Sequence, residues 1–201
     1  REFDLRNSGD VTFSYSNDQF NFNTFTLIHN GGKLDLSGKF SLTGDEDLIL
    51  KLSGFRTKDL YANLLDLPPD RAFGGELNLD FIMSGTADSP VIKLNYSIDS
   101  VRVQNLYLGS IASTIEYSNK LLDVDLRFLE TKDFQSRRWL GFSGNIPIDL
   151  SFYSQERFIK GETIDLTFFA DNFDLRFLTG LVPGVTNLKG FLNGDVKFSG
   201  S

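Results

Sequence analysis

The segment Thr57–Thr86 reads TKDLYANLLDLPPDRAFGGELNLDFIMSGT, and the segment Asn172–Ser201 reads NFDLRFLTGLVPGVTNLKGFLNGDVKFSGS. The two align without a gap at a constant offset of 115 residues (172 − 57). Nine positions are identical: Asp59/Asp174, Leu60/Leu175, Pro68/Pro183, Gly75/Gly190, Leu77/Leu192, Asn78/Asn193, Asp80/Asp195, Ser84/Ser199 and Gly85/Gly200. Repetition at a long period is typical of supersecondary units that stack side by side. The sequence therefore predicts an array with an extended surface rather than one closed catalytic pocket.

Beyond this segment the repeat is looser. Leu36-Ser37-Gly38 resembles Phe142-Ser143-Gly144 at an offset of 106 residues (144 − 38), so insertions are expected in the turns, with 154–161 as a candidate. The most charged connection is 130–138 (ETKDFQSRR). We therefore expect a first repeat unit over 1–129, a charged connection over 130–138 and a second, incomplete unit over 139–201, within one continuous sheet.

Apolar and polar residues alternate with a period of two through most of the chain, which is the pattern of a strand with one apolar and one wet face. Turn-forming clusters such as Asn30-Gly31-Gly32 and Asp88-Ser89-Pro90 separate about a dozen such runs. One wet face favours antiparallel pairing. The fold class predicted is all-β, a long antiparallel amphipathic sheet. The residues expected on its apolar face are Leu34, Leu36, Phe40, Leu42, Leu48, Leu50, Leu52, Leu77, Leu79, Phe81, Met83, Ile92, Leu94, Tyr96, Ile98, Leu122, Val124, Leu126, Phe128, Ile146, Ile148, Leu150, Phe152, Ile164, Leu166 and Phe168.

The size of this apolar face limits what the sheet can be. Strands about 4.8 Å apart make a dozen of them roughly 55–60 Å across. About three apolar side chains per strand give over ~1,000 Å² to cover, more than a soluble monomer normally exposes. At ~25 cal/mol per Å² the exposure is unfavourable by more than ~25 kcal/mol. The sheet must close into a sandwich or barrel, dimerise, or hold lipid in an apolar groove.

Two segments break the period of two and predict short helices near 57–67 and 172–182. In the first, Thr57 is the expected cap and Pro68-Pro69 the stop. In the second, Asn172 is the expected cap and Pro183-Gly184 the stop. Segments this short need an apolar surface to dock on. They either plug one end of a core or form a ledge beside a groove.

The composition excludes several classes of function. The chain has 201 residues, no Cys and a net charge of −7, with no clustered basic residues of the kind that nucleic acid requires. No run approaches the roughly 18–20 apolar residues of a membrane helix. Because the chain begins at Arg1, we expect it to be a piece of a longer protein, with any membrane anchor outside it.

Candidate catalytic and metal sites are few. There is one His against 20 Phe, and we expect His29, beside a turn, to lie on the surface. Asp45-Glu46-Asp47 lacks the spacing of a calcium loop and is expected at a hairpin tip. Asp123, Asp125 and Arg127 share one strand face and are expected to be solvated. We therefore expect no enzyme, no metal site and no cofactor.

Four phrases of the chain resemble the C-terminal repeat region of TamB-like proteins of the AsmA-like superfamily. They are Leu64-Leu65-Asp66-Leu67-Pro68, Gly74–Phe81 (GGELNLDF), Ser84–Pro90 (SGTADSP) and Val103–Gly109 (VQNLYLG). The second copy matches again through Leu181-Val182-Pro183 and Gly190–Val196. The resemblance implies a β-taco, which is a long antiparallel sheet curled into a half-pipe with an apolar inner face.

The resemblance also implies a setting and a task. It implies the periplasm of a diderm bacterium, an inner-membrane anchor outside this chain, and transport of phospholipid toward the outer membrane. A BamA-like outer-membrane barrel (TamA-like) is the implied partner of the full-length protein. The leading hypothesis is a lipid conduit. The alternatives are a chaperone-like scaffold whose strand edges pair with outer-membrane β-barrel proteins or autotransporters, and a closed repeat domain of an adhesin.

Overall fold

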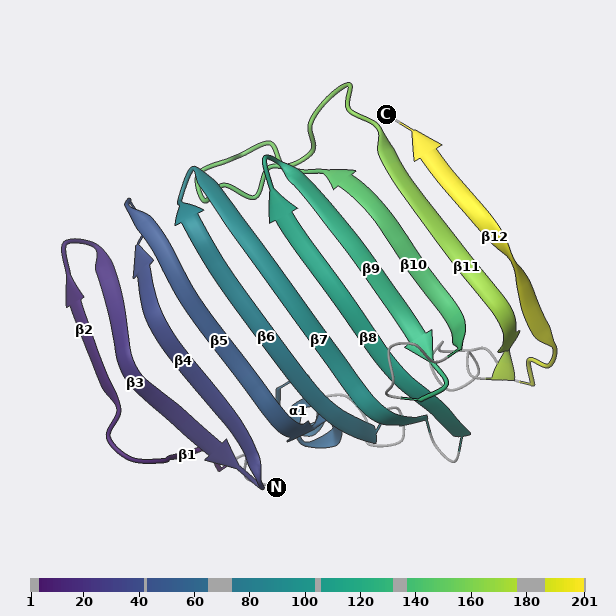
Figure 1. Ribbon diagram of the computed structural model, residues 1–201, viewed down its shortest axis with the longest axis horizontal. Helices are drawn as coiled ribbons and strands as arrows, with labels where there is room; N and C mark the ends of the chain where they lie inside the picture. Colours follow the sequence, from purple (N-terminus) through teal and green to yellow (C-terminus); the bar gives the residue numbers. More distant parts are fainter. Residues whose placement is uncertain are drawn as a thin grey trace.

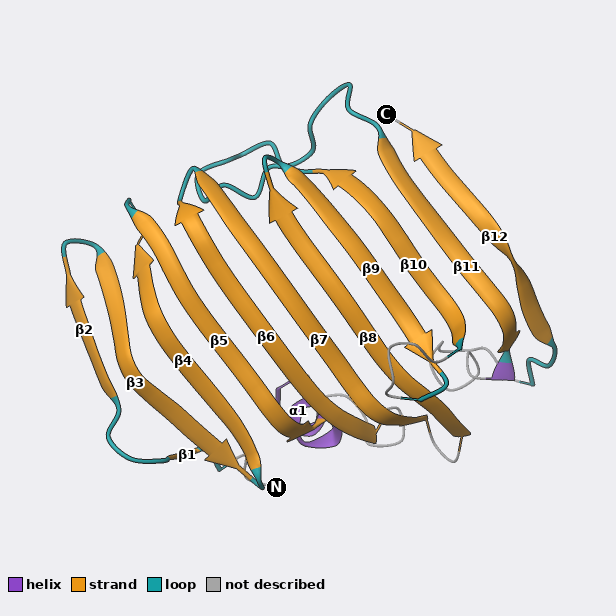
Figure 2. Ribbon diagram, in the orientation of Figure 1, coloured by secondary structure: helices purple, strands orange, loops and turns teal. Residues whose placement is uncertain are grey.

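The structure is a computed structural model that describes residues 4–41, 43–64, 74–103, 106–131, 137–176 and 187–200. Within these residues the strands form a single antiparallel sheet of twelve strands, in the order β1-β3-β4-β5-β6-β7-β8-β9-β10-β11-β12, with β2 also paired to β3 (Figure 1). From β3 onward, each strand pairs with the next one along the chain. The predicted all-β antiparallel sheet is confirmed, and it is an open, curled half-pipe whose two edges do not pair with each other (Figure 2).

The elements have the following bounds. The strands are β1 (Arg6–Asn7), β2 (Thr12–Ser16), β3 (Gln19–His29), β4 (Gly32–Ser41), β5 (Asp45–Arg56), β6 (Gly74–Thr86), β7 (Ser89–Val103), β8 (Leu106–Ser118), β9 (Leu121–Leu129), β10 (Arg138–Pro147), β11 (Ile164–Asp174) and β12 (Phe191–Gly200). The helix α1 (Thr57–Leu64) lies between β5 and β6 and contacts both strands.

The strand register separates the sheet into an apolar face and a polar face, because directly paired residues of an antiparallel sheet project to the same side. One row of paired residues on the apolar face crosses ten strands, from β3 to β12: Phe25, Leu36, Leu50, Phe81, Leu94, Ile115, Val124, Gly144, Leu166 and Phe198. The adjoining row on the polar face is Thr26, Asp35, Lys51, Asp80, Asn95, Thr114, Asp125, Ser143, Thr167 and Lys197. The period of two in the sequence thus becomes two chemically distinct surfaces.

Side chains that are register partners on the polar face also contact each other directly. The Thr26 hydroxyl donates to an Asp35 carboxylate oxygen at 2.7 Å, and the Thr114 hydroxyl donates to Asn95 Oδ1 at 3.0 Å. Lys93 and Glu116, which are register partners on the same face, form an ion pair at 2.6 Å. These exposed or half-exposed pairs each contribute a few tenths of a kcal/mol to about 1 kcal/mol. They favour the observed register more than they add to the total stability.

A row of β-bulges bends the sheet along one side. The register shifts between Leu52 and Phe55, between Gly74 and Glu76, between Ile98 and Val101, between Arg138 and Leu140, and between Ala170 and Phe173. All of these shifts lie near the strand ends beside α1, which we call the bulged margin. Because a bulge bends its strand and increases the local twist, aligned bulges curl this margin toward the apolar face.

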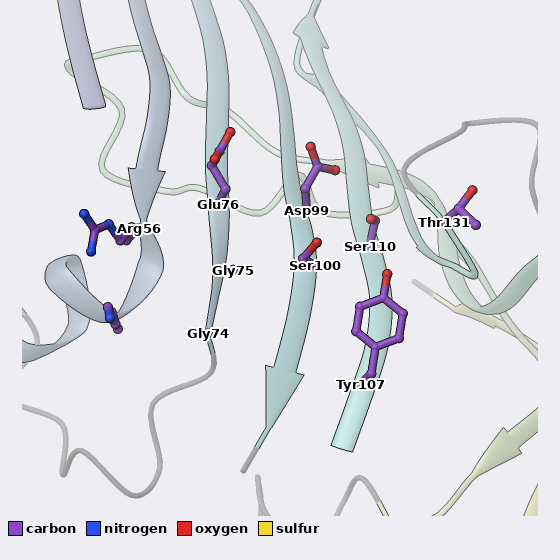
Figure 3. Close-up of a pocket in the computed structure, with 10 residues that line it drawn as sticks. Arg56, Gly74, Gly75, Glu76, Asp99, Ser100, Tyr107, Ser110 and Thr131 are labelled. Carbon is purple, nitrogen blue, oxygen red and sulfur yellow. The ribbon is translucent and has the colours of Figure 1, made fainter. Parts of the chain in front are cut away.

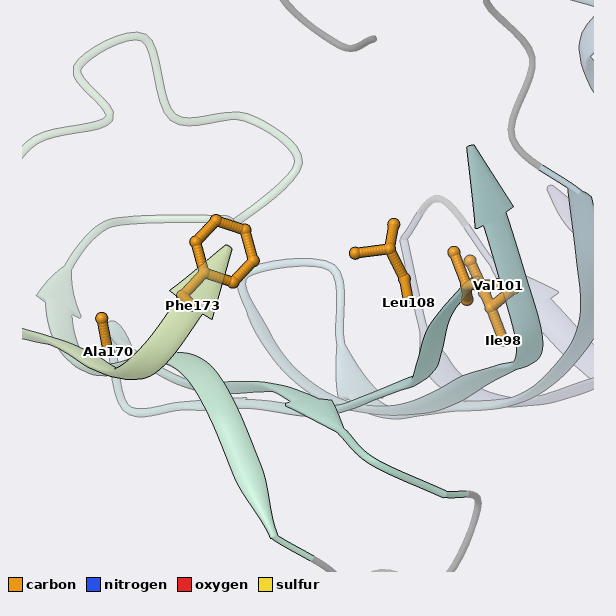
Figure 4. Close-up of a cluster of buried hydrophobic side chains, with 5 residues drawn as sticks. All are labelled: Ile98, Val101, Leu108, Ala170 and Phe173. Carbon is orange, nitrogen blue, oxygen red and sulfur yellow. The ribbon is translucent and has the colours of Figure 1, made fainter. Parts of the chain in front are cut away.

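The main buried cluster lies along the bulged margin. Its members are Ile98, Val101, Leu108, Ala170 and Phe173, each no more than 7% exposed, and their side chains project to the same side of the sheet (Figure 4). Gly109 adopts φ = 85° between Leu108 and Ser110, a conformation that glycine reaches without strain. The curl therefore packs side chains from β7, β8 and β11 that a flat sheet would leave apart.

The connection between β10 and β11 forms a strap, residues 148–163, along the opposite margin (Figure 1). The Ile148 amide donates to the carbonyl of Lys120 in the β8–β9 turn, and the Phe152 amide donates to the carbonyl of Ala87 in the β6–β7 turn, both at 2.9 Å. The Phe152 ring lies 5.6 Å from the ring of Phe40 on β4. The strap therefore runs back from β10 past several hairpins, along what we call the strap margin.

Two sequence predictions about these elements need correction. Ile148, Leu150 and Phe152 belong to the strap and not to a strand, since β10 ends at Pro147. Asn172 is not a helix cap: it lies in the bulge of β11 at φ = 52°, and its amide donates to Asn193 Oδ1 at 2.6 Å. The helix α1 does begin at Thr57 as predicted, and a helical residue occurs at Arg176. The rest of the expected second helix lies outside the described residues.

Candidate functional site: an apolar trough

The apolar face of β3–β12, between the bulged margin and the strap margin, forms the candidate site, which we call the trough. Of the side chains predicted to line a groove, twenty-two lie on strands and all project to this face by the register. Ile148, Leu150 and Phe152 lie in the strap beside it, and Leu42 lies outside the described residues. The structure brings these residues onto one surface, and their role in binding lipid stays a prediction.

The trough is neither a closed core nor an ordinary wet surface. Of its twenty-two predicted strand residues, only Met83 (6% exposed) and Ile98 (7%) are buried, and the other twenty are half-buried. A fully packed interior would bury nearly all of them. The curl and the neighbouring side chains shield these residues in part, and the remaining apolar surface is open along the middle of the sheet.

The total exposed surface leads to the same conclusion. The chain exposes 12219 Å². A compact protein of 22.6 kDa would expose about 9,500 Å². The excess of about 2,700 Å² is larger than the total area buried in a standard protein interface. The protein therefore exposes more surface than a compact protein of its mass, as expected for a sheet that does not close on itself.

The residues predicted from the sequence to line the groove do not include several residues of the trough. They are Phe20, Phe22, Phe25 and Leu27 on β3, Ile111, Ile115 and Tyr117 on β8, Leu140 and Phe142 on β10, and Leu192, Val196 and Phe198 on β12. On β3, a bulge between Phe22 and Phe25 moves the alternation from even to odd positions and hides it. On β8, the alternation of Ile111, Ile115 and Tyr117 is visible in the sequence, but the polar Ser113 interrupts it.

The strap is tied to the trough by polar contacts. Lys120 and Asp149 form an ion pair at 2.9 Å, and the Ser151 amide donates to the Asp149 carboxylate at the same distance. The pKa of Asp149 lies well below its usual range. The contact with the Lys120 ammonium is the largest cause, and hydrogen bonds from Ser151 are the next. The Leu150 amide donates to the hydroxyl of Tyr117, a residue of the apolar face that is only 2% exposed. The strap thus covers part of the strap margin.

One carboxyl group lies on the apolar face near the strap margin. Glu46 is 3% exposed and is the register partner of Gly85. Its Oε2 accepts a hydrogen bond from the Ser41 amide at 2.9 Å, while its Oε1 is buried without a partner. Burial raises the pKa of Glu46, because the ionised form is poorly solvated there.

A further hollow lies outside the trough. It has a volume of ≈ 680 Å³ and lies at the bulged margin on the polar face, where Arg56, Glu76 and Asp99 are register partners (Figure 3). Tyr107 and Ser110 complete one side. Its lining is open and carries both positive and negative side chains. The described residues contain no group of three His, Cys, Asp or Glu side chains that could hold a metal ion.

His29 is buried rather than exposed, which corrects the sequence prediction. It is 6% exposed; its Nδ1 lies 2.9 Å from the carbonyl oxygen of Asp4, and its Nε2 lies 3.8 Å from Asp59 Oδ2. The N-terminal segment and α1 cover the end of β3, where His29 lies. The neighbouring turn sequence that begins at Asn30 does not reveal this long-range packing. His29 therefore connects three parts of the fold.

No helix within the described residues is long and apolar enough to cross a membrane. Comparison of the chain with protein-family models, with curated proteins and with solved structures finds no match. The fold and the trough define an open, single-layer amphipathic β-sheet protein. The resemblance to TamB-like proteins remains a prediction that depends on the quoted phrases of sequence.

Proposed function

We propose that the trough holds the acyl chains of phospholipids, and that this chain is a non-enzymatic segment of a TamB-like bridge protein in the periplasm of a diderm bacterium. In this proposal, lipids pass along the apolar face between the inner and outer membranes. The full-length protein would reach a BamA-like outer-membrane barrel of the TamA type. The observation that carries the proposal is the apolar row that crosses ten strands, half-buried from Phe25 to Leu166 and exposed at Phe198 on the last strand.

The dimensions of this row support an extended apolar ligand. Ten strands at about 4.8 Å spacing give a row about 43 Å long, running across the strands. The row contains no charged side chain; its members are Phe, Leu, Ile and Val with Gly144 as the one small residue. A ligand with long, flexible hydrocarbon chains fits such a surface without requiring specific polar contacts.

The open cross-section favours a conduit over the closed-domain alternative. A closed repeat domain of an adhesin would bury the two ends of the sheet against each other, whereas the edges of this sheet do not pair. The strap and the bulged margin shield the sides of the trough and leave its middle accessible. Lipid could therefore enter from the side and move along the strand order.

A pair of matched substitutions tests the proposal. Leu94 lies in the middle of the apolar row, and Ile82 lies on the polar face of the neighbouring strand, 41% exposed. We expect Leu94→Arg to reduce binding of a fluorescent phospholipid at least tenfold, and Ile82→Arg to leave it unchanged. Circular dichroism verifies that both variants keep the sheet. Equal binding by the two folded variants would contradict the proposal.

A further inference from the structure

Glu46 is more deeply buried than the leucines that follow it on the same strand and face. It is 3% exposed, whereas Leu48 and Leu50 are half-buried. Its register partner on β6, Gly85, has no side chain to shield it. Within the described residues its Oε1 has no hydrogen-bond partner, which is unfavourable for a buried carboxyl group. A segment outside these strands therefore covers Glu46 at this end of the trough.

The strap supplies this cover through Phe152. By continuation of the β4–β5 register, Phe40 lies next to Glu46 on the apolar face, and its ring is 5.6 Å from the ring of Phe152. On the other side of β5, the Phe152 amide donates to the carbonyl of Ala87 in the β6–β7 turn at 2.9 Å. Phe152 is thus attached to both neighbours of β5 and lies across the end of the strand that carries Glu46.

The charged groups near this end of the sheet leave Glu46 without a counter-ion of its own among the described residues. Lys39 on β4 favours the ionised form of Glu46, but less than burial opposes it. The other charged groups on the elements that meet here are Asp45, Asp47, Asp88, Lys120, Asp149 and Arg157. The two on β5 project to the polar face, and the one in the β6–β7 turn is exposed. Lys120 pairs with Asp149, and Arg157 donates to carbonyl groups of the strap.

We propose that Glu46 and the strap form a pH-sensitive latch: the strap closes over this end of the trough while the Glu46 carboxyl is protonated, and it moves away when the carboxyl ionises. A protonated carboxyl fits the apolar site beneath Phe152, whereas a carboxylate needs water, which reaches it once the strap is displaced. Because burial raises the pKa of Glu46, closure is favoured below the ordinary value of 4.5 and is lost as the pH rises through the raised value. The latch does not depend on what the trough binds.

Hydrogen exchange at different pH values tests the latch. Between pH 4 and pH 8, the protection factor of the Phe152 amide should fall at least tenfold in the wild type and stay constant in Glu46→Gln. The Leu175 amide, which donates to the carbonyl of Gly190 at the bulged margin, is the control and should behave alike in both proteins. Low concentrations of urea should not change exchange at Phe152, because the opening is local. An equal fall in Glu46→Gln, or exchange at Phe152 only through global unfolding, would overturn the inference.

The coupling between the strap and the proton is reciprocal, so a change in the strap must also shift the titration of Glu46. Phe152→Ala removes the cover and should bring the pKa of the Glu46 carboxyl, followed by carbon-13 NMR, toward its ordinary value of 4.5. Phe158→Ala is the matched control, because Phe158 lies on the same strap and is 66% exposed; it should leave this pKa unchanged. Circular dichroism verifies that both variants keep the sheet. The same pKa of Glu46 in the wild type and in Phe152→Ala would contradict a strap that covers the carboxyl.

Discussion

The two copies of the repeated segment have similar sequences and very different surroundings. β6 lies inside the sheet with a strand on each side, whereas within the described residues β12 pairs with β11 alone. Met83 on β6 is 6% exposed, and its counterpart Phe198 on β12 is 58% exposed. The same alternation of apolar and polar residues therefore specifies the face of the sheet, while the neighbouring strand and the strap determine how far each residue is buried.

The largest difference is expected in the response to truncation of these counterparts. Met83→Ala should lower the free energy of unfolding by about 2–5 kcal/mol, because it leaves a cavity in a packed site. Phe198→Ala should lower it by about 1 kcal/mol or less, since most of the ring is already in water. Urea denaturation measures both. Equal losses would show that the two copies are buried alike in solution.

The paired glycines at the ends of the copies should differ next. Gly85 adopts φ = 89°, and a Cβ there would lie 2.5 Å from the carbonyl oxygen of Ser89. A Cβ on Gly200 would contact nothing within 4 Å. Gly85→Ala should therefore cost about 1–3 kcal/mol of stability, and Gly200→Ala should change it by about 0.5 kcal/mol or less. A tolerated Gly85→Ala, measured by urea denaturation, would contradict the hairpin geometry of the first copy.

A pH-dependent difference is expected from the residues opposite these glycines. Gly85 faces Glu46 across the register, whereas Gly200 faces Ile164. Burial raises the pKa of Glu46 in the folded state. As the pH rises, Glu46 therefore ionises at a lower pH in the unfolded chain than in the folded protein. The contribution of Glu46 to stability is therefore greatest below its ordinary pKa of 4.5 and falls as the pH rises through the raised value.

The variant Glu46→Gln isolates this contribution. The wild type should lose stability relative to Glu46→Gln between pH 4 and pH 8, as followed by urea midpoints. An Ile164→Leu variant, altered at the corresponding position of the second copy, should track the wild type at every pH. A difference between wild type and Glu46→Gln that does not depend on pH would argue against a buried ionisable group.

The smallest effect is expected at the strap, which covers the turn of the first copy and not the end of β12. Lys120 lowers the pKa of Asp149, so this contact stabilises the strap above the ordinary pKa of 3.8 and weakens as the pH falls toward the lowered value. At pH 6, Asp149→Asn should speed hydrogen exchange at the Phe152 amide severalfold, because Lys120 is exposed and the pair is screened. Amides of β12 should not change. An unchanged Phe152 amide would show that backbone contacts alone hold the strap.

The sequence was sufficient to predict the sheet, its two faces and the helix at Thr57, because these follow from local periodicity and local caps. It was not sufficient for β3 or for Asn172, where bulges insert a residue and change which side chains share a face. The burial of His29 and the course of the strap depend on contacts between residues far apart in the chain. The open cross-section also required the structure, since alternation alone fits a closed sandwich equally well.

The most direct test of the central claim is photocrosslinking from the trough. A benzoylphenylalanine replaces Tyr96, which lies half-buried on the apolar face, or Val91, which is 43% exposed on the polar face of the same strand. Each protein is mixed with phospholipid vesicles, irradiated and analysed by mass spectrometry. The proposal predicts phospholipid adducts at position 96 and few or none at position 91. Adducts in equal yield at both positions, or at neither, would contradict a lipid-holding trough.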